Sequence, residues 1–176
     1  MINVEIKARA TLEQQRAAVE WLDGFAQGPD GSIVSYKGRD NQSDTYFNVP
    51  NGRLKLREGN IENCLIQYDR PDKYGPKVSK YNLIYVKQGD IKDALTKALG
   101  VLVVVNKQRD IHYLGNIKIH LDKVDNLGYF IEIEARDEQE TMGLEELRRQ
   151  CDQLIAVFQI RDEDLVSQSY SDMLLR

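Results

Sequence analysis

The chain has 176 residues, of which 41% are hydrophobic and 30% are charged, and its formal net charge at pH 7 is −4. This length is typical of one substantial domain, so we expect residues 1–176 to form a single domain. The negative total argues against a general polyanion-binding surface, so a basic site must come from local clustering. No apolar run approaches the roughly 18 residues of a membrane span, and the N-terminus lacks a signal-peptide core, which predicts a cytoplasmic protein.

Strand signals recur along the chain, because segments that alternate apolar and polar side chains, or that are rich in β-branched residues, lie between turn residues. The predicted strands cover 2–10, 32–37, 44–49, 52–58, 62–68, 78–87 and 101–109, then a hairpin over 110–122 around Gly115-Asn116, and finally 129–136. A polar loop over 38–43 is expected to join the second and third strands. The segment 69–80 is rich in proline, glycine and cations, and it is either a mobile lid or a polar loop.

Three helices are predicted among these strands. The first begins after Thr11, where Gln14 completes a capping box, and the second begins at Asp90 and ends before Gly100. The third carries an apolar stripe that should cover the outside of a sheet, formed by Leu144, Leu147, Cys151, Leu154 and Phe158. Cys151 and Cys64 lack the spacing of a metal site and are predicted to be buried thiols in a reducing compartment.

The charge pattern is clearest in residues 52–58, where alternate positions place Arg53, Lys55 and Arg57 in one row of a strand. Other strands repeat this pattern, and helices packed outside would cover the apolar faces and leave the charged faces together. The sequence therefore predicts an α+β fold with about eight antiparallel strands and flanking helices, and this number of strands is enough to close into a β-barrel whose charged faces line a lumen. An open sheet whose charged face meets water is the alternative, and pattern alone does not decide between them.

In the closed barrel, cations and acids would share one lumen. The cations are Lys7, Arg9, Arg53, Lys55, Arg57, Lys87, Lys107, Arg109 and Lys118, and the acids are Glu5, Asp122, Glu132 and Glu134. Since an isolated ionised group costs several kcal/mol to desolvate, such a lumen must be wet and must hold counter-charge. A triphosphate with Mg²⁺ or Mn²⁺ would supply it, because cations bind phosphate and carboxylates bind hard metal ions.

Six groups of residues form a recognisable series in this order. They are Val4-Glu5-Ile6-Lys7-Ala8-Arg9, Asp44-Thr45-Tyr46-Phe47, the stretch 52–58, Arg70-Pro71-Asp72 with Gly75-Pro76-Lys77, His120-Leu121-Asp122, and Leu127 to Glu134. This series resembles the CYTH family, the superfamily of triphosphate tunnel metalloenzymes that includes class IV adenylyl cyclases and thiamine triphosphatases. The resemblance runs from about residue 2 to residue 172, including Ser169-Tyr170.

The resemblance implies a closed eight-stranded antiparallel β-barrel, a tunnel with a charged lumen and flanking helices. This tunnel would bind a triphosphate with a divalent metal, and the resemblance assigns roles by motif match. Glu5 and Lys7 match the second acid and the lysine of a Glu-x-Glu-x-Lys signature, and Lys7 would contact phosphate or orient the attacking oxygen. The residues that match phosphate-binding strands are Arg53, Lys55, Arg57, Lys107 and Arg109. The residues that match metal ligands are Glu132 and Glu134, with Asp122 as a helper.

Three positions depart from the family pattern. Asn3 replaces the first signature acid, Gln67 stands near a position where some members carry a cation, and His120 stands where an arginine is common. Asn3 therefore weakens the case for a tight second metal site.

We expect a metal-dependent phosphohydrolase that acts on nucleoside, organic or inorganic triphosphates such as ATP, thiamine triphosphate or tripolyphosphate. One alternative is a class IV-type adenylyl cyclase that makes cyclic AMP and pyrophosphate from ATP. The other is a non-catalytic module that binds phosphorylated nucleotides or RNA ends, which the replacement at Asn3 would favour. No membrane or long nucleic acid is expected as a partner, and a homodimer is compatible with the sequence.

Overall fold

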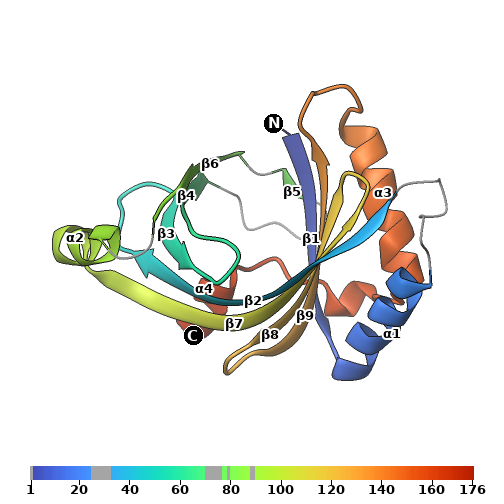
Figure 1. The fold of residues 1–176 in the computed structure, drawn as a ribbon, viewed down its shortest axis with the longest axis horizontal. Helices are drawn as coiled ribbons and strands as arrows, with labels where there is room; N and C mark the ends of the chain where they lie inside the picture. Colours follow the sequence, from blue (N-terminus) through green and yellow to red (C-terminus); the bar gives the residue numbers. More distant parts are fainter. Residues whose placement is uncertain (1, 25–32, 70–76, 79, 88–89) are drawn as a thin grey trace.

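Nine antiparallel strands form one curved sheet in the order β5-β1-β9-β8-β7-β2-β3-β4-β6 (Figure 1). The structure is a computed structural model, and it describes residues 2–24, 33–69, 77–78, 80–87 and 90–176. The strands are β1 (Ile2–Ala10), β2 (Val34–Phe47), β3 (Arg53–Glu58), β4 (Cys64–Asp69), β5 (Lys77–Val78), β6 (Lys80–Tyr85), β7 (Val101–Leu114), β8 (Ile117–Val124) and β9 (Gly128–Asp137). The helices are α1 (Leu12–Asp23), α2 (Asp90–Leu99), α3 (Leu144–Val157), a short 3-10 helix (Asp162–Asp164) and α4 (Tyr170–Leu174).

The α+β class, the antiparallel sheet and the flanking helices are confirmed. The sheet curls so that the β3–β4–β6 side faces β1 across an inner space (Figure 1). The two ends of the sheet, β5 and β6, are consecutive in the chain, but among the described residues no strand pairing joins them. Hydrogen bonds between described residues therefore do not close a barrel, and the two-residue β5 raises the strand count above eight.

The predicted loop over 38–43 between two strands is wrong, because Val34–Phe47 is one continuous strand. Gly38 has a φ of 129°, and the register with β7 shifts between Tyr36 and Gly38, so the strand passes a bulge where a loop was expected. Two polar residues of the expected loop, Asp40 and Gln42, are buried instead, whereas Arg39 and Asn41 are exposed. Asp40 is fully buried and accepts hydrogen bonds from the backbone N–H groups of Ile61 and Glu62 at 2.9 and 3.0 Å.

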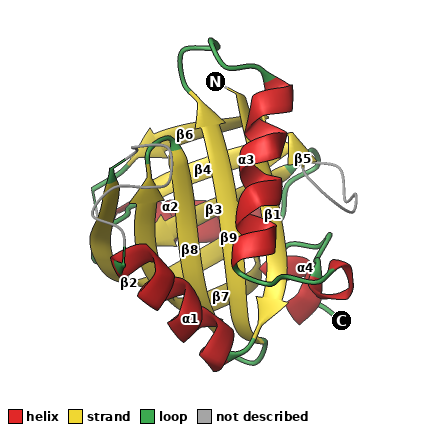
Figure 2. Ribbon diagram, turned by 90° about the vertical axis from the view of Figure 1, so that its right-hand side faces the viewer, coloured by secondary structure: helices red, strands yellow, loops and turns green. Residues whose placement is uncertain are grey.

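An apolar core lies between the outer face of the sheet and two helices. Figure 2 shows α1 and α3 lying across the strands β8, β9 and β1. The α3 stripe is buried as predicted at Leu147, Cys151, Leu154 and Phe158, whereas Leu144 is exposed. The capping box of α1 is also confirmed, since the Thr11 side chain accepts from the Gln14 N–H and the Gln14 side chain accepts from the Thr11 N–H.

A second apolar cluster fills one end of the inner space. Its buried members come from five strands or loops and from the C-terminal segment: Tyr46, Tyr68, Val105, Val124, Phe130 and Tyr170. The helix α4 supplies Tyr170, and the Ser169 side chain caps this helix in a capping box with Asp172. One end of the inner space is thus closed by aromatic side chains, which the sequence analysis did not predict.

The segment 69–80, interpreted as a lid or a loop, lies largely outside the described residues. Both cysteines are buried and free, as expected. In the described part of the chain, no helix is both long enough and apolar enough to cross a membrane.

Candidate functional site

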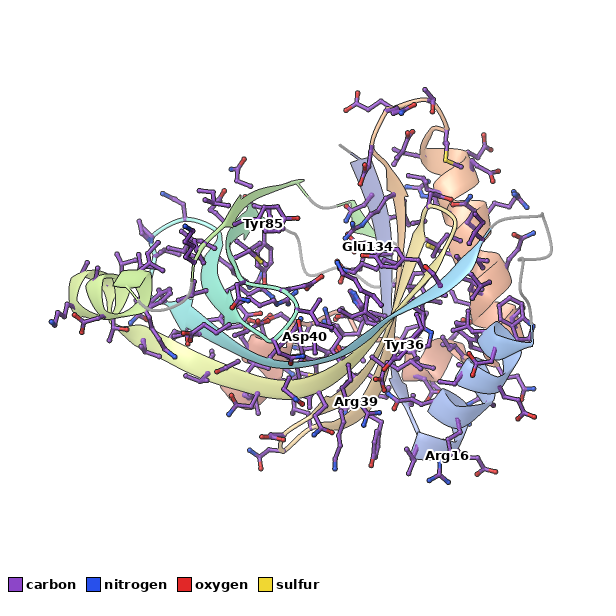
Figure 3. The ribbon with its side chains drawn as sticks, in the orientation of Figure 1. Arg16, Tyr36, Arg39, Asp40, Tyr85 and Glu134 are labelled. Atoms are coloured by element: carbon purple, nitrogen blue, oxygen red, sulfur yellow. The ribbon has the colours of Figure 1, made fainter. Side chains whose placement is uncertain are left out.

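The inner face of the sheet encloses a cavity of about 950 Å³. The predicted site residues that line it are Glu5, Lys7, Lys55, Arg57, Lys107, Arg109, Lys118, Glu132 and Glu134. Figure 3 shows side chains from both sides of the curved sheet directed into this space, with Tyr85 on the β6 side and Glu134 on the opposite side. Strand alternation places these charges inside, and on β1, β8 and β9 the apolar side chains of the opposite face pack against α1 and α3.

One wall of the cavity is built around Asp44, which is 1% exposed. Its carboxylate accepts hydrogen bonds from Lys55 Nζ at 2.9 Å, from Lys107 Nζ at 2.8 Å, and from Arg57 Nε and Nη2 at 2.8 and 2.9 Å. Burial alone would raise the pKa of Asp44, but these three cations hold it well below its usual value. Asp44 belongs to the family-like segment 44–47, but the sequence did not predict a role for it.

Glu62 extends the same wall. It accepts hydrogen bonds from Arg57 Nη1 at 2.9 Å and from Lys118 Nζ at 2.6 Å, and these cations hold its pKa below the usual value despite burial. Four cations of this wall thus share two carboxylates, so the wall keeps a positive excess. Burial lowers the pKa of Lys107 to about 7, an effect that Asp44 opposes.

The facing wall belongs to β1 and β9, where the register places Glu5 opposite Glu134 and Lys7 opposite Glu132. Glu132 lies 3.1 Å from Lys7 Nζ, 2.6 Å from Arg109 Nη2 and 3.2 Å from His120 Nδ1. Burial would raise the pKa of Glu132, but Arg109 and Lys7 hold it well below its usual value. The chain itself therefore supplies part of the counter-charge predicted for the lumen, because Glu132 pairs with Lys7 and Arg109.

Asp122 lies behind this wall and does not line the cavity. Its carboxylate is fully buried, and it accepts hydrogen bonds from Arg109 Nε at 2.7 Å and from the Tyr170 hydroxyl at 2.7 Å. Lys7 Nζ also lies 4.1 Å from the centroid of the Tyr170 ring. Tyr170 of α4 therefore contacts both Asp122, a predicted acid of the site, and Lys7, a predicted cation.

Three predicted phosphate-binding residues do not line the cavity. Arg9 contacts Met173 Sδ at 3.7 Å, Arg53 pairs with Asp172 at 2.9 Å, and Lys87 is exposed beyond the end of β6. Arg9 and Arg53 thus contact the segment that closes the cavity.

The register also clarifies the departure noted at Gln67. Gln67 pairs with Leu54 and Asn82 on the outer face, so it does not stand in the position of an inward cation. The inward residues of β4 are instead apolar or aromatic: Cys64, Ile66 and Tyr68.

The acidic wall offers oxygen atoms that suit a hard divalent cation. Asn3 is 2% exposed, its Nδ2 donates to Glu134 Oε1 at 2.7 Å, and its buried Oδ1 has no hydrogen-bond partner among the described residues. Burial would raise the pKa of Glu134, but Arg136 and Asn3 hold it below its usual value. Among the described residues no group of three or more His, Cys, Asp or Glu side chains is gathered as a metal site, so the candidate donors are two carboxylates and an amide oxygen.

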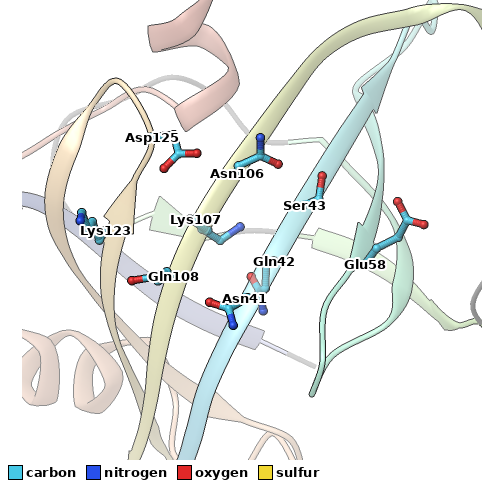
Figure 4. A pocket seen from close by; sticks show the side chains of 9 residues that line it. All are labelled: Asn41, Gln42, Ser43, Glu58, Asn106, Lys107, Gln108, Lys123 and Asp125. Carbon is cyan, nitrogen blue, oxygen red and sulfur yellow. The ribbon is translucent and has the colours of Figure 1, made fainter.

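A second, smaller pocket of about 380 Å³ lies over β2 and β7 (Figure 4). Amide and hydroxyl side chains gather there, with Asn41 and Ser43 on β2 paired with Gln108 and Asn106 on β7. None of these four residues was predicted as a site residue. They alternate with the residues of the charged wall, so they follow from the same strand pattern.

Comparison with known proteins identifies the family. The family model of the CYTH domain matches residues 1–170. The chain belongs to the CYTH family. No curated protein sequence matches the chain.

Solved structures share the CYTH fold of this chain along nearly its whole length. The PH1012 protein of Pyrococcus horikoshii OT3 has a TM-score of 0.75 and 22% identity over 97% of this chain and 98% of its own. A candidate adenylate cyclase of Vibrio parahaemolyticus has a TM-score of 0.72 and 20% identity over 100% and 99%. The Pct1 RNA triphosphatase of Schizosaccharomyces pombe has a TM-score of 0.58 and 13% identity over 91% and 84%.

Proposed function

We propose that this CYTH protein is a divalent-metal-dependent phosphohydrolase that acts on triphosphate-containing substrates. The observation that carries the proposal is the cavity itself, in which a wall with excess positive charge faces a wall of carboxylates. The names of two fold neighbours, a candidate adenylate cyclase and an RNA triphosphatase, are consistent with triphosphate chemistry.

The positive wall supplies the contacts that a triphosphate needs. Lys55, Arg57, Lys107 and Lys118 would donate hydrogen bonds to its non-bridging oxygens. An ammonium group has three N–H donors and a guanidinium has five, so pairing with Asp44 and Glu62 does not exhaust them. The two carboxylates hold the cations in place before the substrate arrives, which reduces the reorganisation needed when charge develops on the transferring phosphoryl group.

The acidic wall would hold the metal through Glu5 and Glu134 and the unpartnered Oδ1 of Asn3, with Glu132 beside them. Oxygen donors of this kind suit Mg²⁺ and Mn²⁺. A metal bound there would act as a Lewis acid on phosphate oxygens. The amide oxygen of Asn3 is neutral, so we expect weaker metal binding than a third carboxylate would give.

Lys7 would act on the reacting oxygen. Glu132 and the Tyr170 ring fix its ammonium group, and Asp122 fixes the neighbouring Arg109. In hydrolysis, water attacks the terminal phosphorus, the bond to the bridging oxygen breaks, and orthophosphate leaves together with the diphosphate. We assign to Lys7 the orientation of this water and to Asp122 the positioning of Arg109.

Product analysis tests the proposal. Purified protein is incubated with ATP, thiamine triphosphate or tripolyphosphate in Mg²⁺ or Mn²⁺, and we expect metal-dependent orthophosphate release that Lys55→Ala and Glu134→Gln each lower at least about 100-fold, the loss expected for removing a charge-stabilising group. Lys97→Ala is the matched control, because Lys97 is an exposed cation paired with Asp93 on α2. Mn²⁺ binding to wild type and Glu134→Gln, followed by electron paramagnetic resonance, tests the metal site without turnover.

The same assay separates the two alternatives. Cyclic AMP and pyrophosphate from ATP would identify a class IV-type adenylyl cyclase, in which the ribose 3′-hydroxyl attacks the α-phosphorus. Tight triphosphate binding without any product would identify a binding module. Orthophosphate release that the variants do not change would contradict the proposed site.

A further inference from the structure

The first part of β7 has a strand on only one of its two sides. β2 pairs with β7 from Val101 to Leu114, whereas β8 pairs only with the part from Lys107 to Leu114. Figure 1 shows the first part of β7 running past the end of the β8–β9 hairpin towards α2. Among the described residues, no strand pairs with the other side of 101–105. Backbone N–H and C=O groups on such an edge are free to pair with another strand.

A hydrogen bond just beyond this segment shows which backbone groups face the unpaired edge. The carbonyl of Asn106 accepts from the N–H of Asp125 at 3.0 Å, so the backbone of Asn106 faces the β8 side of the strand. In an antiparallel sheet, alternate residues of a strand direct their backbone groups to the same side. The N–H and C=O of Val104 therefore face the unpaired edge, whereas those of Val103 face β2.

The side chains of the segment 101–105 are apolar, and several are exposed. Val101, Leu102 and Val104 are 41%, 46% and 41% exposed. Proteins commonly place a charge or a proline on a free strand edge to prevent pairing between molecules, but this segment contains neither. Four of its five residues are valines, which favour the extended conformation. The edge therefore has the properties of one that accepts another strand.

We propose that this edge pairs with the same edge of a second copy of the chain, so that the sheet continues from one protomer into the other. Antiparallel pairing about a two-fold axis places the segment opposite itself, and it is favourable only where no like charges meet. The uncharged segment 101–105 meets that condition, and it offers no charge by which a different partner could be selected. Because both copies use the same edge, association ends at the dimer.

The neighbouring structure limits the length of the shared sheet. At one end Asp125 occupies the edge beside Asn106, and at the other end α2 stops at Leu99, before Gly100. Pairing is therefore confined to 101–105, and we expect a reversible dimer with a Kd of about 1–100 µM, as befits a small interface. None of these residues lines the inner cavity, so the dimer does not occupy the proposed site.

Sedimentation velocity tests the inference on the purified chain. We expect the wild type to change from monomer to dimer between about 1 and 300 µM. Val104→Lys adds a charge to the edge, and Val104→Pro removes the N–H that faces it without touching the pairing with β2, so both variants should stay monomeric. Ile84→Lys is the matched control, because Ile84 is an apolar residue of β6 that is 58% exposed, and this variant should dimerise as the wild type does.

Amide hydrogen exchange followed by NMR locates the interface. The N–H of Val104 should exchange more slowly as the protein concentration rises, whereas the N–H of Val103 should change little because it already faces β2. Circular dichroism establishes that the variants fold, and the exchange of Val104 in the wild type tests the interface even if Val104→Pro does not. A wild type that stays monomeric at the highest concentration, or a dimer that Val104→Lys does not weaken, would overturn the inference.

Discussion

Replacing Asp44 by Asn tests whether this carboxylate holds the positive wall together. The substitution preserves the shape of the side chain but leaves Lys55, Arg57 and Lys107 without their shared counter-charge. Removing one partner of a buried ion pair costs about 3–5 kcal/mol. We expect a loss near 3 kcal/mol in the free energy of unfolding, because the three cations are only partly stranded.

The structure shows why each of the three cations would keep part of its stabilisation after Asp44 is replaced. Arg57 keeps its hydrogen bond to Glu62, the Lys55 side chain is 13% exposed, and Lys107 can lose its proton because its pKa is about 7. Urea unfolding followed by circular dichroism at pH 7 measures the loss. The control is Asp93→Asn, which breaks an exposed pair with Lys97 and should cost less than about 0.5 kcal/mol.

The pH dependence of this difference gives a second check. The pKa of Asp44 is lower in the folded protein than the ordinary value of 3.8, so its contribution to stability is full above that value and is lost as pH falls through the folded pKa. The part of this difference that comes from the ionised Asp44 should therefore shrink below about pH 4, as Asp44 becomes protonated. A loss below about 1 kcal/mol at pH 7 would refute the role assigned to Asp44.

Three further predictions concern buried groups. Tyr170→Phe removes the 2.7 Å hydrogen bond to Asp122 and should lower the free energy of unfolding by about 1.5–3 kcal/mol in urea, whereas an unchanged midpoint would contradict this bond. Burial lowers the pKa of His120 to about 4, so an NMR titration should find a neutral imidazole at pH 6. The stability from this neutral form should be full above about pH 6.5 and fall as pH drops towards 4, and titration near 6.5 would refute it. Burial raises the thiol pKa of Cys64, and that of Cys151 to about 12, so a thiol reagent at pH 8 should label them only after unfolding, and rapid labelling of the native protein would contradict their burial.

Several elements could be predicted from local sequence because their signals are local. Alternation in 2–10, 52–58 and 129–136 gave the inward and outward faces that the structure has, and Thr11 with Gln14 gave the start of α1. The capping pattern of Ser169 and Asp172 carries the same kind of local signal for the start of α4. Signals of this kind extend over a few residues, so they do not depend on the rest of the fold.

The bulge at Gly38 shows where local reasoning fails. The polar run of 38–43 is typical of a loop, but pairing with β7 along this whole segment, joined by β3 from Ser43 onward, makes it part of a continuous strand. Buried polar groups are tolerated there because Asp40 and Gln42 find hydrogen-bond partners in the segment 61–62. Such partners are distant along the chain until the sheet forms.

The sequence by itself determined the family motifs and the face on which each charge lies, because the direction of a side chain from a strand follows its position. Only the tertiary structure decided which charges meet. Asp44 binds Lys107 across 63 residues, and Tyr170 reaches Asp122 across 48. The curvature of the sheet and the docking of α4 set these contacts, and they separate the residues that line the cavity from Arg9 and Arg53 at its closed end. Register and curvature arise from packing between distant segments, so no local pattern contains them.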